Sequence, residues 1–130
     1  MTWVEPCATS LIELRPPLAA RVGDLSRDAA SAAPGRTAEL ARVRVQQLLG
    51  VGHHAMPSDV TAAETAALAV VEQFIIDVHG LSDATFAELS NHYTPAEQMG
   101  LLFHLALLDG FTKLDILAPV DLAPIDQGDR

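Results

Sequence analysis

ELARVRVQQLLGVGHHAMPS, residues 39–58, joins an amphipathic helical pattern to a glycine-broken end that carries two adjacent histidines. Apolar residues recur at helical spacing along one side of its first half. Glu39, Arg42 and Gln46 recur three and four residues apart and therefore share a second stripe. A carboxylate, a guanidinium and an amide on one stripe either face water or line a pocket. We expect any chemistry of this chain to lie here.

Two glycines predict the end of this helix. Gly50 and Gly52 follow the last periodic residues and are typical of a helix C-terminus. His53 and His54 then lie near the negative end of the helix dipole, which favours a cationic side chain. The two histidines are either site residues or surface loop residues without a special role.

Helical patterns flank this segment on both sides and predict an all-helical fold of about five helices. We expect the other helices at about 17–30, 62–79, 83–92 and 95–117. Thr61 with Glu64, and Thr94 with Glu97, form two capping boxes that mark helix starts. The predicted inward-facing residues are Leu18, Val22 and Leu25 in the first helix and Ala67, Leu68, Val71, Phe74, Ile75 and Val78 in the helix after the histidines.

The helix predicted at 95–117 is apolar on nearly every side. In so small a domain, a helix of this kind is either central or covered by a partner. We therefore predict self-association through 95–117, giving a homo-oligomer. His104 lies amid leucines and is expected to be a core or interface histidine whose pKa is lowered by burial.

The chain of 130 residues predicts one helical domain over 17–118. Prolines in residues 1–16 predict an extended N-terminal arm, in which Trp3 needs apolar cover from its own domain or from another subunit. The proline- and aspartate-bearing segment 119–130 is expected to be an irregular acidic tail.

The charge and cysteine content restrict the classes of partner and compartment. A formal net charge of -9 with only 8 Lys and Arg argues against binding to a phosphate backbone, so no nucleic-acid partner is expected. No apolar run is long enough to span a bilayer, and the N-terminus lacks a signal-peptide pattern. Cys7 is the single cysteine and excludes an intrachain disulfide. These features predict a cytoplasmic protein without a membrane partner.

Three segments carry a resemblance to a known family: ELARVRVQQLLG at 39–50, AALAVVEQFIIDVHGLSDATFAEL at 66–89 and TPAEQMGLLFHLALLDGFTKL at 94–114. Their sequences and their order along the chain resemble those of the carboxymuconolactone decarboxylase / alkylhydroperoxidase D-like family. That resemblance implies an oligomeric alkylhydroperoxidase D-like helical bundle. The stretch DGFTK at 109–113 is similar to the family's Asn-Gly-Phe-Asn-Arg, with both polar positions changed.

The peroxidase branch of the resembled family carries Cys-x-x-Cys-x-x-x-His after the glycine and a proton-transferring Glu upstream. Glu39 occupies the position of that Glu. Val51 and His54 stand where the two cysteines would be, and Ser58 stands where the His would be. Dithiol peroxide reduction needs a nucleophilic and a resolving thiol, so the resemblance implies the fold without this activity.

Two functions follow as expectations. The first is a cofactor-free lyase, decarboxylase or isomerase acting on a small organic acid or lactone, with Glu39 as general acid/base and His54 or His53 as its partner. Arg42 and Gln46 would bind the small-molecule substrate. The alternative is a non-catalytic oligomeric scaffold or ligand-binding relative of the same fold.

A metal site is not predicted. His53, His54, Asp59 and His79 are the nearest candidate ligands, but adjacent histidines point in different directions. No His-x-x-x-His spacing places two ligands on one helical face. We expect neither a metal nor another cofactor.

Overall fold

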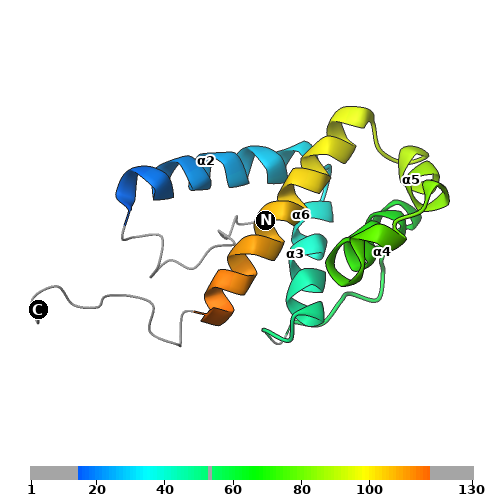
Figure 1. Ribbon diagram of the computed structural model, residues 1–130. Coiled ribbons are helices and arrows are strands. Elements are labelled where there is room, and N and C mark those ends of the chain that lie inside the picture. Colours follow the sequence, from blue (N-terminus) through cyan, green and yellow to red (C-terminus); the bar gives the residue numbers. More distant parts are fainter. Residues whose placement is uncertain (1–14, 53, 118–130) are drawn as a thin grey trace, which may run out of the picture.

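The computed structural model describes residues 15–52 and 54–117, which form helices and connecting turns without a β-strand (Figure 1). The helices are α2 (Pro16–Ala32), α3 (Thr37–Leu48), α4 (Ala62–Ile76), α5 (Asp83–Ser90) and α6 (Pro95–Leu117), with a 3-10 turn η1 at Val78–Gly80. The all-helical prediction is confirmed for this part of the chain. No helix among these residues is long and apolar enough to cross a membrane.

The predicted arm and tail lie largely outside the described residues. Of the arm, 1–16, only Arg15 and Pro16 are described, and Pro16 begins α2. The tail, 119–130, lies wholly outside. The oligomeric bundle of the resembled family stays a prediction.

Both predicted capping boxes are present. The Thr61 hydroxyl accepts from the Glu64 N–H at 3.1 Å, and the Glu64 carboxylate accepts from the Thr61 N–H at 2.9 Å. The Thr94 and Glu97 pair repeats this arrangement, at 3.2 and 2.8 Å. A cap of this kind contributes about 1 kcal/mol, and here two caps fix where α4 and α6 begin.

The central helix of the domain is α6, which lies between α2 on one side and α3 and α4 on the other (Figure 1). Its residues Leu101, Leu105 and Leu108 are fully buried. The remaining core residues come from α3, α4, α5 and the α5–α6 connection: Ala41, Val45, Ala67, Val70, Val71, Leu89 and Tyr93. Phe74 and Ile75 pack at the edge of this core.

The end of α4 differs from the prediction of a helix to His79 with Val78 inside. α4 stops at Ile76 because Asp77 has extended backbone dihedrals, and a 3-10 turn follows. The side-chain amide of Gln73 donates to the Asp77 carbonyl at 3.0 Å and stabilises this break. Val78 is 51% exposed, so its predicted burial is wrong.

The inner face of α2 also differs from the prediction. Leu18 and Leu25 are each 48% exposed, whereas the buried residues of α2 are small: Gly23, Ser26, Ala29 and Ala30. The reason is the close approach of α2 to α6. A Cβ built on Gly100 would lie 2.2 Å from the Ala32 Cβ and 3.2 Å from the Ala29 carbonyl oxygen. Side chains as large as leucine cannot lie between helices this close, so they lie beside the contact.

Candidate functional site

The polar stripe of α3 forms a continuous row of hydrogen bonds. The Arg42 guanidinium donates to both carboxylate oxygens of Glu39, with 3.0 Å between Nε and Oε2. Its Nη1 donates to Oε1 of Gln46 at 3.2 Å. The Glu39 and Arg42 side chains are only 28% and 11% exposed. The three predicted site residues on α3 therefore lie together, and the carboxylate raises the pKa of Arg42.

A buried histidine of α6 lies behind this row. His104 is fully buried, and its Nε2 lies 2.9 Å from the Ala38 carbonyl oxygen. A carbonyl only accepts, so Nε2 carries the proton and donates. Burial lowers the pKa of His104, and the nearby Arg42 charge adds to this effect. The Ala38 hydrogen bond and the Glu39 charge partly oppose it.

Of the two predicted site histidines, only His54 is described, and it is not part of this group. His54 is exposed, and its carbonyl accepts from Nε2 of Gln47 at 3.0 Å. Its ring makes no hydrogen bond to residues 15–52 or 54–117. His53 lies outside the described residues. The imidazole near Glu39 is that of His104, which sequence reasoning placed in the core but not beside α3, because no local pattern links residues so far apart in the chain.

Gly52 lies beside the Gln46 side chain of α3, at a position that favours glycine. Its φ of 76° is in the left-handed region that favours glycine. A Cβ built on Gly52 would meet Oε1 of Gln46 at 3.2 Å. The Gln46 side chain, which accepts from Arg42, therefore occupies the space that a side chain at position 52 would need.

These contacts restrict the chemistry of the row. A general base needs a lone pair within hydrogen-bond reach of the substrate proton, and each Glu39 oxygen already uses one of its two lone pairs to accept from Arg42. A substrate carboxylate that binds through the Nε and Nη2 donors of the guanidinium would have to displace Glu39 first. The negative Glu39 in the first turn also stabilises the helix dipole of α3, which is a structural role.

A second charged cluster joins the start of α3 to the start of α4. Arg36 donates to both carboxylate oxygens of Glu64, at 2.8 and 3.0 Å, and to the Asp59 carboxylate at 3.2 Å. These bonds lower the pKa of Glu64 to about 2. Beside them, the Thr37 and Tyr93 hydroxyls are 2.9 Å apart and buried. Sequence reasoning identified Glu64 as a cap and missed Arg36, because this partner lies in a loop without a pattern.

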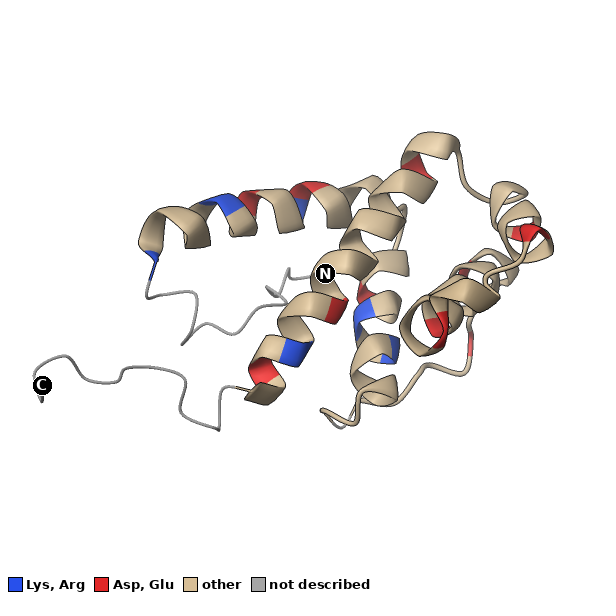
Figure 2. Ribbon diagram, viewed as in Figure 1, with Lys and Arg blue, Asp and Glu red and all other residues tan. Residues whose placement is uncertain are grey.

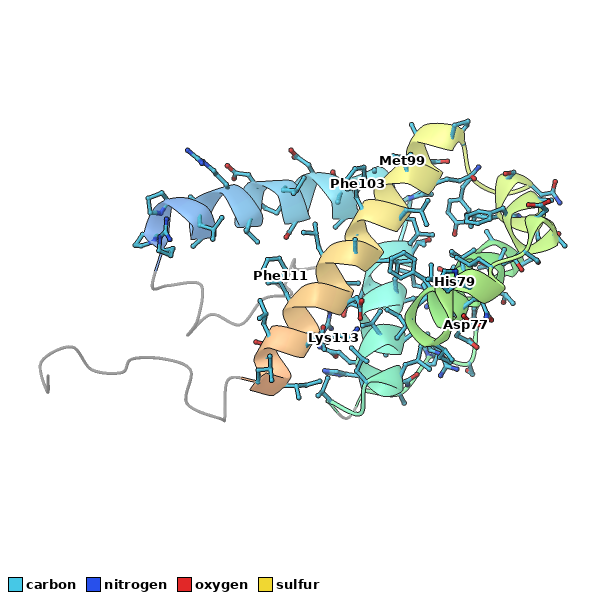
Figure 3. All side chains as sticks on the ribbon, viewed as in Figure 1. Asp77, His79, Met99, Phe103, Phe111 and Lys113 are labelled. Atoms are coloured by element: carbon cyan, nitrogen blue, oxygen red, sulfur yellow. The ribbon has the colours of Figure 1, made fainter. Side chains whose placement is uncertain are left out.

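A hollow of about 380 Å³ lies beside the crossing of α2 and α6. Figure 3 labels Met99 and Phe103 on the part of α6 that crosses α2. The apolar walls of this hollow are formed by Leu25, Ala29, Ala32, Ala96, Met99 and Phe103. Met99 and Phe103 are each 53% exposed. We call this hollow the α2–α6 groove.

Charged residues are unevenly distributed over the helices, and α4 and α5 carry no Lys or Arg (Figure 2). Within residues 15–52 and 54–117, no three His, Cys, Asp or Glu side chains converge as metal ligands do. Comparisons with protein-family models, curated proteins and solved structures give no match. The residues quoted above therefore carry the family resemblance alone.

Proposed function

We propose that this chain is a non-catalytic helical scaffold that self-associates through the C-terminal half of α6. The observation that carries the proposal is an exposed apolar stripe formed by Ala106, Gly110, Leu114 and Leu117. These residues follow each other at spacings of four, four and three, so they share one face of the helix. The spacing is that of helices that pack along one another.

The arrangement of α2 and α6 also supports self-association through the C-terminal half of α6. α2 crosses the N-terminal half of α6 and diverges from its C-terminal half (Figure 1). Leu114 and Leu117 are 36% and 45% exposed. Burying such side chains against a second copy removes apolar surface from water, at roughly 25 cal/mol per Å².

Gly110 lies in the middle of this stripe. A Cβ built on Gly110 would meet no other atom within 4 Å. No packing within the described residues explains a glycine here, and glycine costs about 1 kcal/mol relative to alanine inside a helix. Close approach of a second helix gives Gly110 a role, because the missing side chain lets two backbones come together.

Size-exclusion chromatography with light scattering tests this function through Gly110→Arg. The open space around residue 110 accommodates the arginine in the single chain, whereas a second helix on the stripe collides with it. The matched control is Ile76→Arg, at a 69% exposed apolar position on α4. We expect the wild type and Ile76→Arg to associate and Gly110→Arg to remain a single chain. Equal association of all three proteins would overturn the proposal.

A second candidate is a cofactor-free lyase or isomerase for a small organic acid or lactone. One observation favours it: the half-buried Glu39–Arg42 pair lies near His104, and burial lowers the pKa of His104. In this function Arg42 binds the substrate carboxylate, and Glu39, once displaced, transfers the proton.

Turnover of lactones and of β-keto or enol acids tests this candidate. Wild type is compared with Glu39→Gln and with Glu72→Gln, which changes a partly exposed carboxylate that pairs with Arg44 of α3. We expect turnover that Glu39→Gln abolishes and Glu72→Gln retains. Turnover by Glu39→Gln equal to that of the wild type would remove Glu39 from the mechanism.

A further inference from the structure

The α2–α6 groove is an apolar hollow that faces solvent in the described part of the chain. Its volume of about 380 Å³ is within the usual range for small-ligand sites. Met99 and Phe103 from α6 and Leu25 from α2 are all about half exposed around it. Exposed apolar residues gathered in one hollow mark a surface that is covered by something else.

One polar group lies on the wall of this groove. Asp28 of α2 is exposed and lines the hollow. Its backbone carbonyl accepts from the Ser31 hydroxyl at 2.9 Å. Its carboxylate has no hydrogen bond or ion pair within residues 15–52 and 54–117. The groove therefore combines an apolar volume with one free acceptor, which suits a large apolar group that carries a single N–H.

The indole of tryptophan is such a group. It buries about 150–250 Å² of surface, and its N–H usually finds an acceptor when buried. The chain has one tryptophan, Trp3, within the segment 1–14 that precedes the described residues. Five other large apolar residues share this segment: Met1, Val4, Leu11, Ile12 and Leu14.

We propose that the α2–α6 groove binds the N-terminal segment of the same chain, with the Trp3 indole in the hollow and its N–H donated to Asp28. The described chain begins at Arg15, next to the first residue of α2. From there to Leu25 is roughly 15 Å along the helix, and to Ala32 roughly 26 Å. The twelve residues from Trp3 to Arg15 span up to about 40 Å when extended. The segment therefore reaches any part of the groove without help from a second chain.

Intrinsic fluorescence of the full chain tests this proposal, because Trp3 is the only tryptophan. We expect a blue-shifted emission and several-fold weaker quenching by acrylamide than for free tryptophan. Phe103→Ser removes one wall of the groove, so its emission shifts to the red and its quenching rises several-fold. Ile76→Ser is the matched control, because it removes an exposed apolar side chain from α4, away from the groove, and leaves the emission unchanged.

A second variant keeps the test independent of folding. Asp28→Ala lies at an exposed helical position, where alanine is well tolerated, and we expect it to increase acrylamide quenching with unchanged helical circular dichroism. Red-shifted, freely quenched emission in the wild type would overturn the proposal. A blue shift that disappears on dilution would also overturn it, because the occupant would then be the segment of a second copy.

The result of the Trp3 fluorescence test can be distinguished from the result of the self-association test. The stripe at 106–117 and the groove use different parts of α6, and light scattering on the same samples reports the oligomeric state. Buried Trp3 in a single chain supports the groove and contradicts the scaffold, whereas exposed Trp3 in an oligomer does the reverse.

Discussion

Gly100 and Gly110 lie ten residues apart on α6, and alanine is expected to have opposite effects on stability at the two positions. Both substitutions gain about 1 kcal/mol of helix propensity. At Gly110 nothing else changes, because a Cβ meets no other atom within 4 Å. We therefore expect Gly110→Ala to stabilise the single chain by up to about 1 kcal/mol.

At Gly100 the added Cβ would lie 2.2 Å from the Ala32 Cβ, whereas carbon atoms pack best at about 3.5–4 Å. The second neighbour, at 3.2 Å, is the Ala29 backbone carbonyl. Neither atom belongs to a flexible side chain, so α2 must move away from α6. Such overpacking costs roughly 1–3 kcal/mol. After the propensity gain, we expect Gly100→Ala to destabilise the chain by up to about 2 kcal/mol.

Urea unfolding followed by far-ultraviolet circular dichroism measures both variants against the wild type. The measurement is made at concentrations where the chain is single, so that a second copy on Gly110 does not contribute. The two midpoints are expected to fall on opposite sides of the wild type. If Gly100→Ala were as stable as Gly110→Ala, the result would contradict the close approach of α2 and α6 at Gly100.

Further predictions concern ionisation and the core. The pKa of Glu64 is about 2 in the folded chain, below its ordinary 4.5. The stability that Glu64 contributes is therefore present above pH 4.5 and is lost as the pH falls toward 2. In a curve of unfolding free energy against pH, Glu64→Gln should reduce this loss at acid pH. The pKa of His104 lies below its ordinary 6.5, so below pH 6.5 the unfolded chain binds a proton on this residue that the folded chain does not. The free energy of unfolding therefore decreases as the pH falls below 6.5. His104→Gln, which keeps a donor for the Ala38 carbonyl, should remove this pH dependence. Leu105→Ala in the core should cost about 2–5 kcal/mol in urea unfolding, against under about 1 kcal/mol for Leu18→Ala at a 48% exposed position.

The sequence predicted the helices well because helix starts and stops are local. Thr61 and Thr94 each stand three residues before a glutamate, and this spacing alone places the starts of α4 and α6. The end of α4 was less predictable, since the break at Asp77 depends on its own backbone and on Gln73.

The packing of α2 could not be predicted from its periodicity. Leu18 and Leu25 form one possible inner face and Gly23 and Ser26 form another, and hydrophobicity favours the leucines. The packing partner α6 determines which face of α2 is buried, because the helices approach so closely at Gly100 that leucine does not fit between them. The choice therefore depends on a contact between residues far apart in the chain.

The candidate site was predicted in part for the same reason. Glu39, Arg42 and Gln46 lie together because their spacing on one helix requires it. His104 joins them only through the packing of α6 on α3, which periodicity does not specify. His54, which is near in sequence, is exposed, and its side chain makes no hydrogen bond or ion pair within the described residues.

Sedimentation equilibrium of the wild-type chain over a range of concentrations tests the scaffold function most directly. A single chain has a mass of 13.8 kDa. We predict an average mass that rises above this value with concentration, because the stripe from Ala106 to Leu117 is covered by a second copy. A mass of one chain at every concentration would contradict the account.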